Sequence, residues 1–498
     1  MKRIAAIAAA LLLIIPSLLL FVGCSNDERV LRVFNWEEYI SEEDDPESGS
    51  IDIIAAFEEE YGVTVEYSTF GTNENMYNEL QINPGGYDLV CPSDYMIMKM
   101  IDEDMVEPFS DEFLQNGTYS QHVSPYIADL FESNGWTQYA AAYMWGTMGY
   151  VYNPDLVDVE DLTSWAGIWN EKYRSKSTIK DSVRDSYFLG VAYVYRDELT
   201  ALAQRHAGGE LNDEEYNAQI TSIMNRTDQE TLDRVADALI ELKSLLYGFE
   251  VDSGKQDMIT GKITINFCWS GDGVYAMDEA EPFTDDDGVY HDGIYLNYVV
   301  PDECTNIWFD GWVMPKGADT ELAEAFINFL SRPENAIANM NYIGYTSAIA
   351  GDEVFDEMVD WYGEGEEGDV DENGDPLVPY DINYFFEGTG EYDDYSIWVS
   401  EESLSRQVSA QYPTEEVILR SAVMANFDSE TNALVNDMWE QVKSQPVPVG
   451  AYVTIAVIAA AVLVIVLTYL YRAKPSAAKP KKGYRRARQC DHRHSRII

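Results

Sequence analysis

The chain is predicted to be an α/β protein with a mainly parallel sheet, followed by one transmembrane helix near its C-terminus. From residue 30 onward, short apolar segments typical of strands alternate with amphipathic segments typical of helices. Residues 451–471 form an uncharged, apolar stretch of 21 residues, which is long enough to cross a bilayer. The length of 498 residues, 46% of them hydrophobic, allows two or three domains with a sizeable core.

The first elements alternate regularly between strand and helix. Strands are expected at residues 30–35, 63–69, 87–91, 149–153, 263–269 and 307–315. Helices are expected at residues 51–61, 74–81, 230–246 and 319–330. The last of these helices has Asp319 as its N-cap and ends before Pro333. In parallel α/β sheets, ligands bind at the carboxyl ends of the strands, so we expect the functional residues there.

The charge of the chain is strongly acidic but unevenly distributed. There are 88 Asp and Glu against 32 Lys and Arg, which gives a net charge of −56. Two of the basic residues precede residue 25 and ten follow Tyr471, so the body between them is more acidic than the whole chain. Such a body repels nucleic acid, which excludes that class of partner, and attracts cationic ligands.

The N-terminus has the layout of a secretory signal peptide. Lys2 and Arg3 precede an apolar segment, and Gly23-Cys24 follows it. This ending resembles the bacterial lipobox, so residues 1–24 are interpreted as a lipoprotein signal peptide with lipidation at Cys24. Phe21 stands where the lipobox usually has Leu. An ordinary signal peptide or an uncleaved anchor is the alternative.

The C-terminus carries the second membrane signal. The apolar stretch 451–471 is followed at once by the basic tail 472–498. The positive-inside rule places this tail in the cytoplasm and the acidic body on the extracytoplasmic face of the cell membrane. A buried helix of a globular domain is the alternative for the apolar stretch.

Signatures of catalysis and of metal binding are absent or incomplete. The chain has five His, none of them paired at i, i+4, and it lacks the GxSxG, HExxH and phosphate-loop motifs. We therefore expect no catalytic residue, no cofactor and no metal. Asp369-Val-Asp371-Glu-Asn373-Gly374 matches the first half of a calcium loop, but Tyr380 replaces the bidentate Glu at position 12, so a solvated acidic loop is favoured over calcium binding. Cys91, Cys268 and Cys304 lie far apart in sequence; a Cys268–Cys304 bridge stays open beside three unpaired thiols.

Several predicted strand ends carry a Trp or Tyr beside an acid. The instances are Trp36/Glu38/Tyr39, Ser93/Asp94/Tyr95, Arg184/Asp185, Trp269/Asp272 and Trp308/Asp310. The face of an aromatic ring attracts an ammonium group, and a carboxylate then orients that group by a charge-assisted hydrogen bond. Any one pair is more often a core aromatic beside a surface acid. Their recurrence at strand ends favours a site for a linear diamine or polyamine.

The same residues belong to motifs that resemble a known family. The motifs are Asn35-Trp36-x-Glu38-Tyr39-Ile40, Tyr67-Ser68-Thr69-Phe70, Tyr87-Asp88-Leu89-Val90-x-Pro92-Ser93, Trp145-Gly146, Ser164-Trp165-x-x-Ile168-Trp169, Trp308-x-Asp310, Ile327-Asn328-Phe329-Leu330-x-Arg332-Pro333 and Ile343-Gly344-Tyr345. In this order, over residues 31 to about 445, they are similar to the solute-binding proteins of ABC-type spermidine/putrescine importers.

The resemblance implies a two-lobed, periplasmic-binding-protein-like fold of type II with a hinge. Lobe 1 would comprise residues 29–150 and 309–347, and lobe 2 residues 151–308 and 348–445. The lobes would close on putrescine or spermidine and deliver it to ABC permease subunits, while ATP hydrolysis would belong to another subunit. Another small solute, or a role as a surface sensor or adhesion protein, is the alternative.

The resemblance also implies the residues of the site. Those lining the polyamine channel would be Trp36, Tyr39, Ser93, Tyr95, Trp269, Trp308 and Tyr345. Those meeting the amino groups would be Glu38, Asp185 and Asp310. Asp272 matches the putrescine-type version of its motif. Glu37 and Ser182 depart from the family pattern, so the preferred polyamine stays open, with putrescine favoured.

Overall fold

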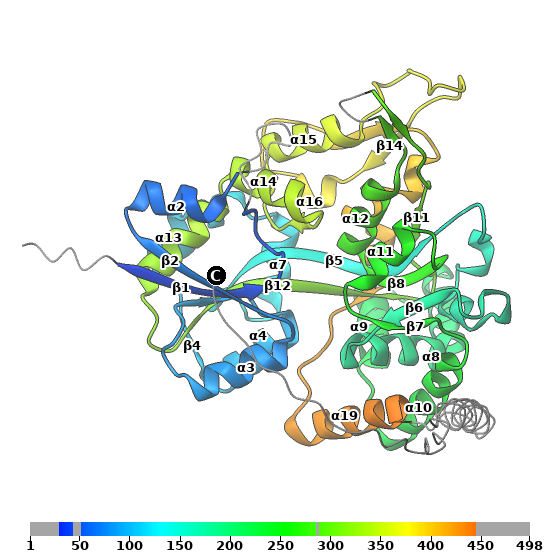
Figure 1. The fold of residues 1–498 in the computed structure, drawn as a ribbon, viewed down its shortest axis with the longest axis horizontal. Helices are drawn as coiled ribbons and strands as arrows, with labels where there is room; N and C mark the ends of the chain where they lie inside the picture. Colours follow the sequence, from blue (N-terminus) through cyan, green and yellow to red (C-terminus); the bar gives the residue numbers. More distant parts are fainter. Residues whose placement is uncertain (1–28, 43–50, 285–287, 445–498) are drawn as a thin grey trace, which may run out of the picture. The chain divides into compact units, whose positions relative to one another are not determined.

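The computed structural model describes residues 29–42, 51–284 and 288–444, and Figure 1 shows their arrangement. The predicted signal peptide with Cys24, the predicted helix 451–471 and the tail 472–498 lie outside the described residues. The description below concerns the unit of the chain that ends at Lys443.

The bounds of the elements are as follows. The strands are β1 Val30–Trp36, β2 Thr64–Phe70, β3 Leu89–Val90, β4 Val106–Glu107, β5 Ala140–Tyr152, β6 Ser177–Lys180, β7 Gly248–Glu250, β8 Ile265–Trp269, β9 Phe283–Thr284, β10 Tyr290–His291, β11 Asn297–Val299, β12 Thr305–Pro315, β13 Thr346–Ser347, β14 Val378–Asp381, β15 Ser396–Val399 and β16 Ser421–Ala422. The α-helices are α2 Ile53–Tyr61, α3 Asn73–Ile82, α4 Asp94–Asp102, α5 Asp111–Asn116, α6 Thr118–His122, α7 Pro125–Ser133, α8 Val183–Ala207, α9 Asp213–Met224, α10 Gln229–Lys243, α11 Ser253–Ile259, α12 Ser270–Ala280, α13 Thr320–Leu330, α14 Pro333–Ile343, α15 Asp352–Tyr362, α16 Asn383–Phe386, α17 Gln407–Gln411, α18 Glu415–Leu419 and α19 Ser429–Ser444.

Two parallel groups of strands are joined by two long antiparallel strands. The main sheet has the order β2-β1-β3-β12-β5-β8-β6-β7. Strands β1, β2 and β3 pair in parallel, as do β6, β7 and β8. Strands β5 and β12 pair antiparallel with each other and with their outer neighbours, and Figure 1 shows them running side by side between the two groups. The prediction of a mainly parallel sheet therefore holds for the outer groups and is wrong for the centre.

The predicted elements are present, with shifted ends. Helix α2 begins after Asp52, whose side chain accepts a hydrogen bond from the Ala55 N–H, and helix α13 has Asp319 as its N-cap, as predicted. The strand predicted at 149–153 is only the last part of β5, all thirteen residues of which are buried. Because both faces of β5 are covered, its sequence lacks the alternation that marks a half-buried strand.

The apolar interior consists of two large clusters that meet on the long strands. On β5, Trp145 belongs to the first cluster and Met148 to the second; on β12, Phe309 belongs to the first and Trp308 to the second. The chain thus passes to the second cluster along β5, returns to the first along β12, and enters the second again after Tyr412. Buried residues of 348–412, which were expected in lobe 2, pack in the first cluster together with β1. The lobe boundaries themselves stay a prediction.

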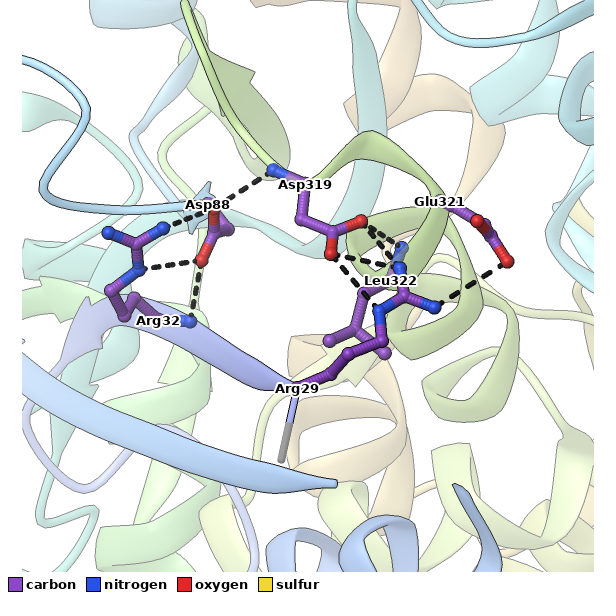
Figure 2. Close-up of polar contacts among 6 residues, drawn as sticks. All are labelled: Arg29, Arg32, Asp88, Asp319, Glu321 and Leu322. Carbon is purple, nitrogen blue, oxygen red and sulfur yellow. Dashed lines mark hydrogen bonds and ion pairs between the residues drawn. The ribbon is translucent and has the colours of Figure 1, made fainter. Parts of the chain in front are cut away.

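The start of β1 is attached to helix α13 by a polar network (Figure 2). Asp88, whose side chain is fully buried, accepts hydrogen bonds from the Arg32 N–H at 3.0 Å, from Arg32 Nε at 2.9 Å and from the Asp319 N–H at 2.9 Å. Arg29 Nη2 donates to Asp319 Oδ1 at 2.7 Å. This network fixes the positions of β1, β3 and α13 relative to one another. It therefore also fixes the position of the carboxyl end of β1, where the site begins.

Candidate functional site

The site is built where the ends of β1 and β3 meet the centre of β12. Tyr39 follows β1, Ser93 follows β3, and Asp310 lies within β12. Ser93 and Asp310 form an isolated antiparallel bridge, and the Gly311 N–H donates to the Pro92 carbonyl at 3.0 Å. The register of β12 against β5 shifts between Asp310 and Gly311. Such a β-bulge redirects a side chain, and here it brings Asp310 to the strand ends.

Asp310 is a buried carboxylate with spare acceptor capacity. Only 7% of the residue is exposed, and its Oδ2 accepts a hydrogen bond from Tyr39 Oη at 2.8 Å. Its Oδ1 is buried and has no hydrogen-bond partner among the described residues. Burial raises the pKa of Asp310 to about 6, although the nearby Ser93 and Tyr39 side chains lower it. A buried carboxylate left in this state lacks the cation that would compensate its charge.

Asp94 is a second buried carboxylate at the same place, and it was not among the predicted site residues. It is 2% exposed, and its oxygens accept hydrogen bonds from the Tyr95 N–H at 2.5 Å and the Phe309 N–H at 3.3 Å. Burial, together with the nearby charge of Asp310, raises the pKa of Asp94 to about 7. The strand-end motif that contains Asp94 was recognised in the sequence, but nothing in the motif shows that its carboxylate is buried.

Asp185 joins these acids from the other cluster. It lies in the first turn of α8, whose N-cap Ser182 accepts a hydrogen bond from the Asp185 N–H at 3.4 Å. Burial raises the pKa of Asp185, while Ser182 and Lys180 lower it, and its charge in turn raises the pKa of Asp310. Asp310 thus links Asp94 and Asp185 into one group of acids, since Asp185 makes Asp310 harder to ionise and Asp310 does the same to Asp94.

The neighbouring Arg184 is also buried near this group. Its guanidinium lies 4.7 Å from the ring centroid of Tyr95 and 4.1 Å from that of Phe427, and its Nη2 donates to the Ala425 carbonyl. Its Nε and Nη1 have no hydrogen-bond partner among the described residues. Arg184 therefore connects Tyr95, which follows β3, with the segment before α19.

Asp272, in contrast, has cationic partners within the chain. Its Oδ2 accepts a hydrogen bond from Lys180 Nζ at 2.6 Å, and its Oδ1 lies 3.6 Å from Lys255 Nζ. Tyr345 Oη donates to Oδ1 at 2.9 Å. Burial raises the pKa of Asp272, but the two lysines outweigh it and the net shift is downward. The sequence did not predict a role for Lys180, because a single lysine at the end of a short strand carries no signal of a site.

Aromatic rings connect the Asp310 group with Asp272. Tyr39, which donates to Asp310, lies 5.4 Å from Tyr345 between ring centroids, and Tyr345 donates to Asp272. Trp308 lies 5.6 Å from Tyr345. A Cβ atom at Gly271 would come within 2.3 Å of the Tyr345 ring, so the glycine before Asp272 allows this ring to lie against the start of α12. Of the predicted residues, the structure brings together Tyr39, Ser93, Asp185, Trp269, Asp272, Trp308, Asp310 and Tyr345.

The other predicted residues lie around this set. Trp36 packs on Phe70 with ring centroids 4.6 Å apart, and Tyr95 Oη donates to Glu74 at 3.1 Å. Glu38 is exposed and adopts a positive φ of 52°. It has this conformation in the turn after β1, which directs the chain toward Tyr39.

A separate cavity of about 480 Å³ lies between α12, α14 and α17 and contains none of the predicted site residues. Its charged groups are paired: Arg406 donates to Glu281, and Gln407 Nε2 donates to Asp278 at 2.9 Å, whereas the neutral Gln411 Oε1 is buried without a hydrogen-bond partner among the described residues. Because its unpartnered group is an amide and not a carboxylate, this cavity is a weaker candidate for a cation than the group around Asp310.

The structure also bears on the cysteine, metal and membrane predictions. Cys91, Cys268 and Cys304 are buried and free, so the Cys268–Cys304 bridge is not formed. In the described segments, His, Cys, Asp and Glu nowhere gather in the groups of three or more that could hold a metal ion. Asp371 Oδ1 instead accepts hydrogen bonds from the Asn373 and Asp375 N–H groups of its own turn. Over residues 29–42, 51–284 and 288–444, no helix has the length and apolar character that a membrane crossing requires.

Known proteins resemble the chain over most of this region. The spermidine/putrescine-binding periplasmic protein of Escherichia coli strain K12 is 27% identical over 323 residues, which cover 64% of this chain and 78% of that protein. The putrescine-binding periplasmic protein SpuD of Pseudomonas aeruginosa is 25% identical over 314 residues, covering 62% and 75%.

Solved structures have the same fold. The spermidine/putrescine ABC transporter substrate-binding protein PotD of Streptococcus pneumoniae has a TM-score of 0.54 and 26% identity, with 83% of this chain and 98% of that chain covered. The Tp0655 lipoprotein of Treponema pallidum has a TM-score of 0.54 at 17% identity, covering 83% and 99%. The predicted two-lobed α/β fold of the periplasmic-binding-protein type is confirmed by these neighbours.

A family model described as bacterial extracellular solute-binding protein matches residues 52–353, which is more than half of the chain. Proteins of this family bind solutes for transport, so the prediction of a binding protein rather than an enzyme is confirmed. The chain belongs to the family of bacterial extracellular solute-binding proteins.

Proposed function

We propose that the chain is the extracytoplasmic receptor of an ABC-type importer and that it binds a linear polyamine, putrescine or spermidine. The observation that carries this proposal is Asp310, a buried carboxylate with an unpartnered oxygen next to two further buried acids and a set of aromatic rings. A ligand ammonium would supply the missing charge and hydrogen bonds. The names of the relatives from E. coli and P. aeruginosa support the same class of ligand.

Binding would follow from the position of the acids on both clusters. Asp310 and Asp94 lie beside the strands of the first cluster, whereas Asp185 lies on α8 of the second. An ammonium between them would be attracted from both sides, and would favour the closed arrangement of the two lobes. Closure would then present the loaded receptor to permease subunits in the membrane.

Titration calorimetry of the purified chain with putrescine, spermidine and spermine tests the ligand class. Binding of at least one of them is expected, and Asp310→Asn is expected to weaken it by roughly 30-fold or more, because loss of one partner of a buried charge pair costs about 2 kcal/mol or more. Asp197→Asn is the matched control, because the Asp197 side chain is 95% exposed. If none of the three amines binds, the proposal is wrong and another solute must be sought.

We also propose that Cys24 carries a lipid anchor and that residues 451–471 cross the membrane with the tail 472–498 in the cytoplasm. The motif around Cys24 and the apolar stretch before the basic tail support this topology. Incorporation of a labelled fatty acid is expected in the parent chain and is expected to be lost in Cys24→Ala. Equal labelling of both would contradict the lipid anchor, without affecting the ligand proposal.

A further inference from the structure

Lys180 is a buried ammonium in the middle of the candidate site. It is the last residue of β6, and its side chain is 1% exposed. Its Nζ donates hydrogen bonds to Asp272 Oδ2 and to the Val251 carbonyl, both at 2.6 Å, and lies 3.2 Å from Glu250 Oε1. It also lies 4.2 Å from the centroid of the Trp269 ring. The ammonium thus makes two hydrogen bonds, and its contact with Glu250 is an ion pair in which Oε1 has no hydrogen-bond partner among the described residues.

These surroundings are the ones that a ligand ammonium would need. They consist of two carboxylates, a backbone carbonyl and the face of an indole ring, which together compensate a buried positive charge. Trp269 and Asp272 are also two of the residues expected to contact the polyamine. At the other end of the site, Asp310 Oδ1 has no hydrogen-bond partner among the described residues, and the nearby cation Arg184 donates to the Ala425 carbonyl rather than to Asp310.

The backbone of Lys180 is fixed by neighbouring elements, and this places its side chain beside Asp272 and Glu250. Its carbonyl accepts a hydrogen bond from Ser186 Oγ at 2.6 Å, and β6 pairs with β7 so that Lys180 stands opposite Glu250. Glu250 Oε2 accepts a second hydrogen bond, from the Gly254 N–H at 2.9 Å. An incoming ligand could reach Asp272 or Glu250 only by displacing an ammonium that is tethered to the sheet.

We propose that Lys180 determines the specificity of the site, because its tethered ammonium takes the place of a ligand amino group beside Trp269, Asp272 and Glu250. This proposal rests on the proposed function, since it concerns which polyamine that site accepts. The ligand then places an ammonium at the acids around Asp310 and finds both carboxylates at the Asp272 end already ion-paired with Lys180. A further ammonium reaching that end would be desolvated next to Lys180 without a partner.

The proposal predicts that the site distinguishes amines by their number of charges. In the parent chain, the third ammonium of spermidine should bring no gain over putrescine. Replacing Lys180 with an uncharged side chain should free Asp272 Oδ2 and Glu250 Oε1 for that third ammonium, while Lys255 stays beside Asp272 Oδ1. Lys180→Met is the sharpest replacement, because methionine has an unbranched, flexible side chain and no charge.

The experiment is titration calorimetry of the full chain with putrescine and with spermidine. Lys180→Met is expected to raise the ratio of spermidine affinity to putrescine affinity at least tenfold, whereas Lys180→Arg, which keeps the charge, is expected to leave the ratio close to that of the parent. Lys172→Met is the matched control, because Lys172 pairs with Asp161 on the surface, with half of its side chain exposed. An unchanged ratio in a folded Lys180→Met chain would overturn the proposal.

A measurement on the parent chain keeps the proposal testable if Lys180→Met does not fold. Spermidine that binds the parent tenfold more tightly than putrescine would show that the third ammonium finds a carboxylate despite Lys180, and would also overturn the proposal. Comparable affinities would support it. If the parent binds neither amine, both the proposed function and the role of Lys180 are wrong. If the amines bind but the ratio of spermidine to putrescine affinity is the same in the parent and in Lys180→Met, only the proposed role of Lys180 is wrong.

Discussion

Asp310→Asn is expected to stabilise the ligand-free chain at neutral and alkaline pH while it weakens ligand binding. In the folded chain burial raises the pKa of Asp310 from 3.8 to about 6. Below pH 4 both the folded and the unfolded chain hold the proton. Between pH 4 and 6 only the folded chain holds it, so the stability contributed by Asp310 falls as the pH rises through this range.

The size of the effect follows from the shift. A difference of about two pKa units corresponds to about 3 kcal/mol at a pH above 6. Asparagine avoids this cost, but the hydrogen bond from Tyr39 to a neutral oxygen is weaker than to a carboxylate, by about 1 kcal/mol. The net gain is about 2 kcal/mol. With an unfolding entropy of roughly 2 cal/mol/K per residue, this raises the Tm of a chain of this size by about 2 °C.

The assay is differential scanning calorimetry of the ligand-free parent and Asp310→Asn at pH 4 and pH 8. We expect a higher Tm for the variant at pH 8 and no gain at pH 4, together with the loss of affinity described above. Asp197→Asn should change neither quantity. A Tm of Asp310→Asn at or below that of the parent at pH 8 would refute the reasoning that Asp310 is held as an uncompensated buried charge.

Two further predictions follow from the same acids and from the network at the start of β1. Affinity for a polyamine should fall as the pH decreases from 8 to 5. Asp94 and Asp310, with pKa values raised by burial to about 7 and about 6, take up protons in this range and lose the charge that pairs with the ligand. Titration calorimetry measures the affinity across this range, and an affinity that does not change with pH would show that these acids do not contact the ligand. Asp88→Asn should destabilise the chain by about 3 kcal/mol and lower its Tm by about 3 °C, because one amide oxygen cannot accept the N–H groups of both Arg32 and Asp319. Thermal unfolding of Asp88→Asn beside Asp197→Asn checks this, and equal Tm values would contradict it.

Local signals in the sequence determined the outer parts of the fold. The alternation of strands and helices around β1, β2 and α2 is encoded in hydrophobic periodicity and in caps such as Asp52 and Asp319. Helix α8 has an N-cap in Ser182 but lacks hydrophobic periodicity, because residues 184–192 of its first half are all buried, and it was not predicted. The same reason explains why β5 was predicted at only part of its length.

The sequence also determined the class of the protein and named most residues of the candidate site. The motifs of aromatic residues and acids at strand ends identified the family and placed Tyr39, Asp185 and Asp310 among the candidate ligands. These predictions needed only neighbouring residues, since each motif is continuous in the chain. The ionisation state of each acid could not be predicted from these motifs, because ionisation depends on burial and on charged residues that are far apart in the sequence.

Only the tertiary structure decided which acids are free to meet a ligand. Asp272 and Asp310 are alike in the sequence, each following a Trp by two or three residues. Asp272 lies beside Lys180, 92 positions away in the chain, whereas Asp310 is buried with an oxygen that has no hydrogen-bond partner among the described residues. Because strand pairing and packing, rather than local sequence, bring a lysine to one acid and leave the other alone, this difference exists only in the folded protein.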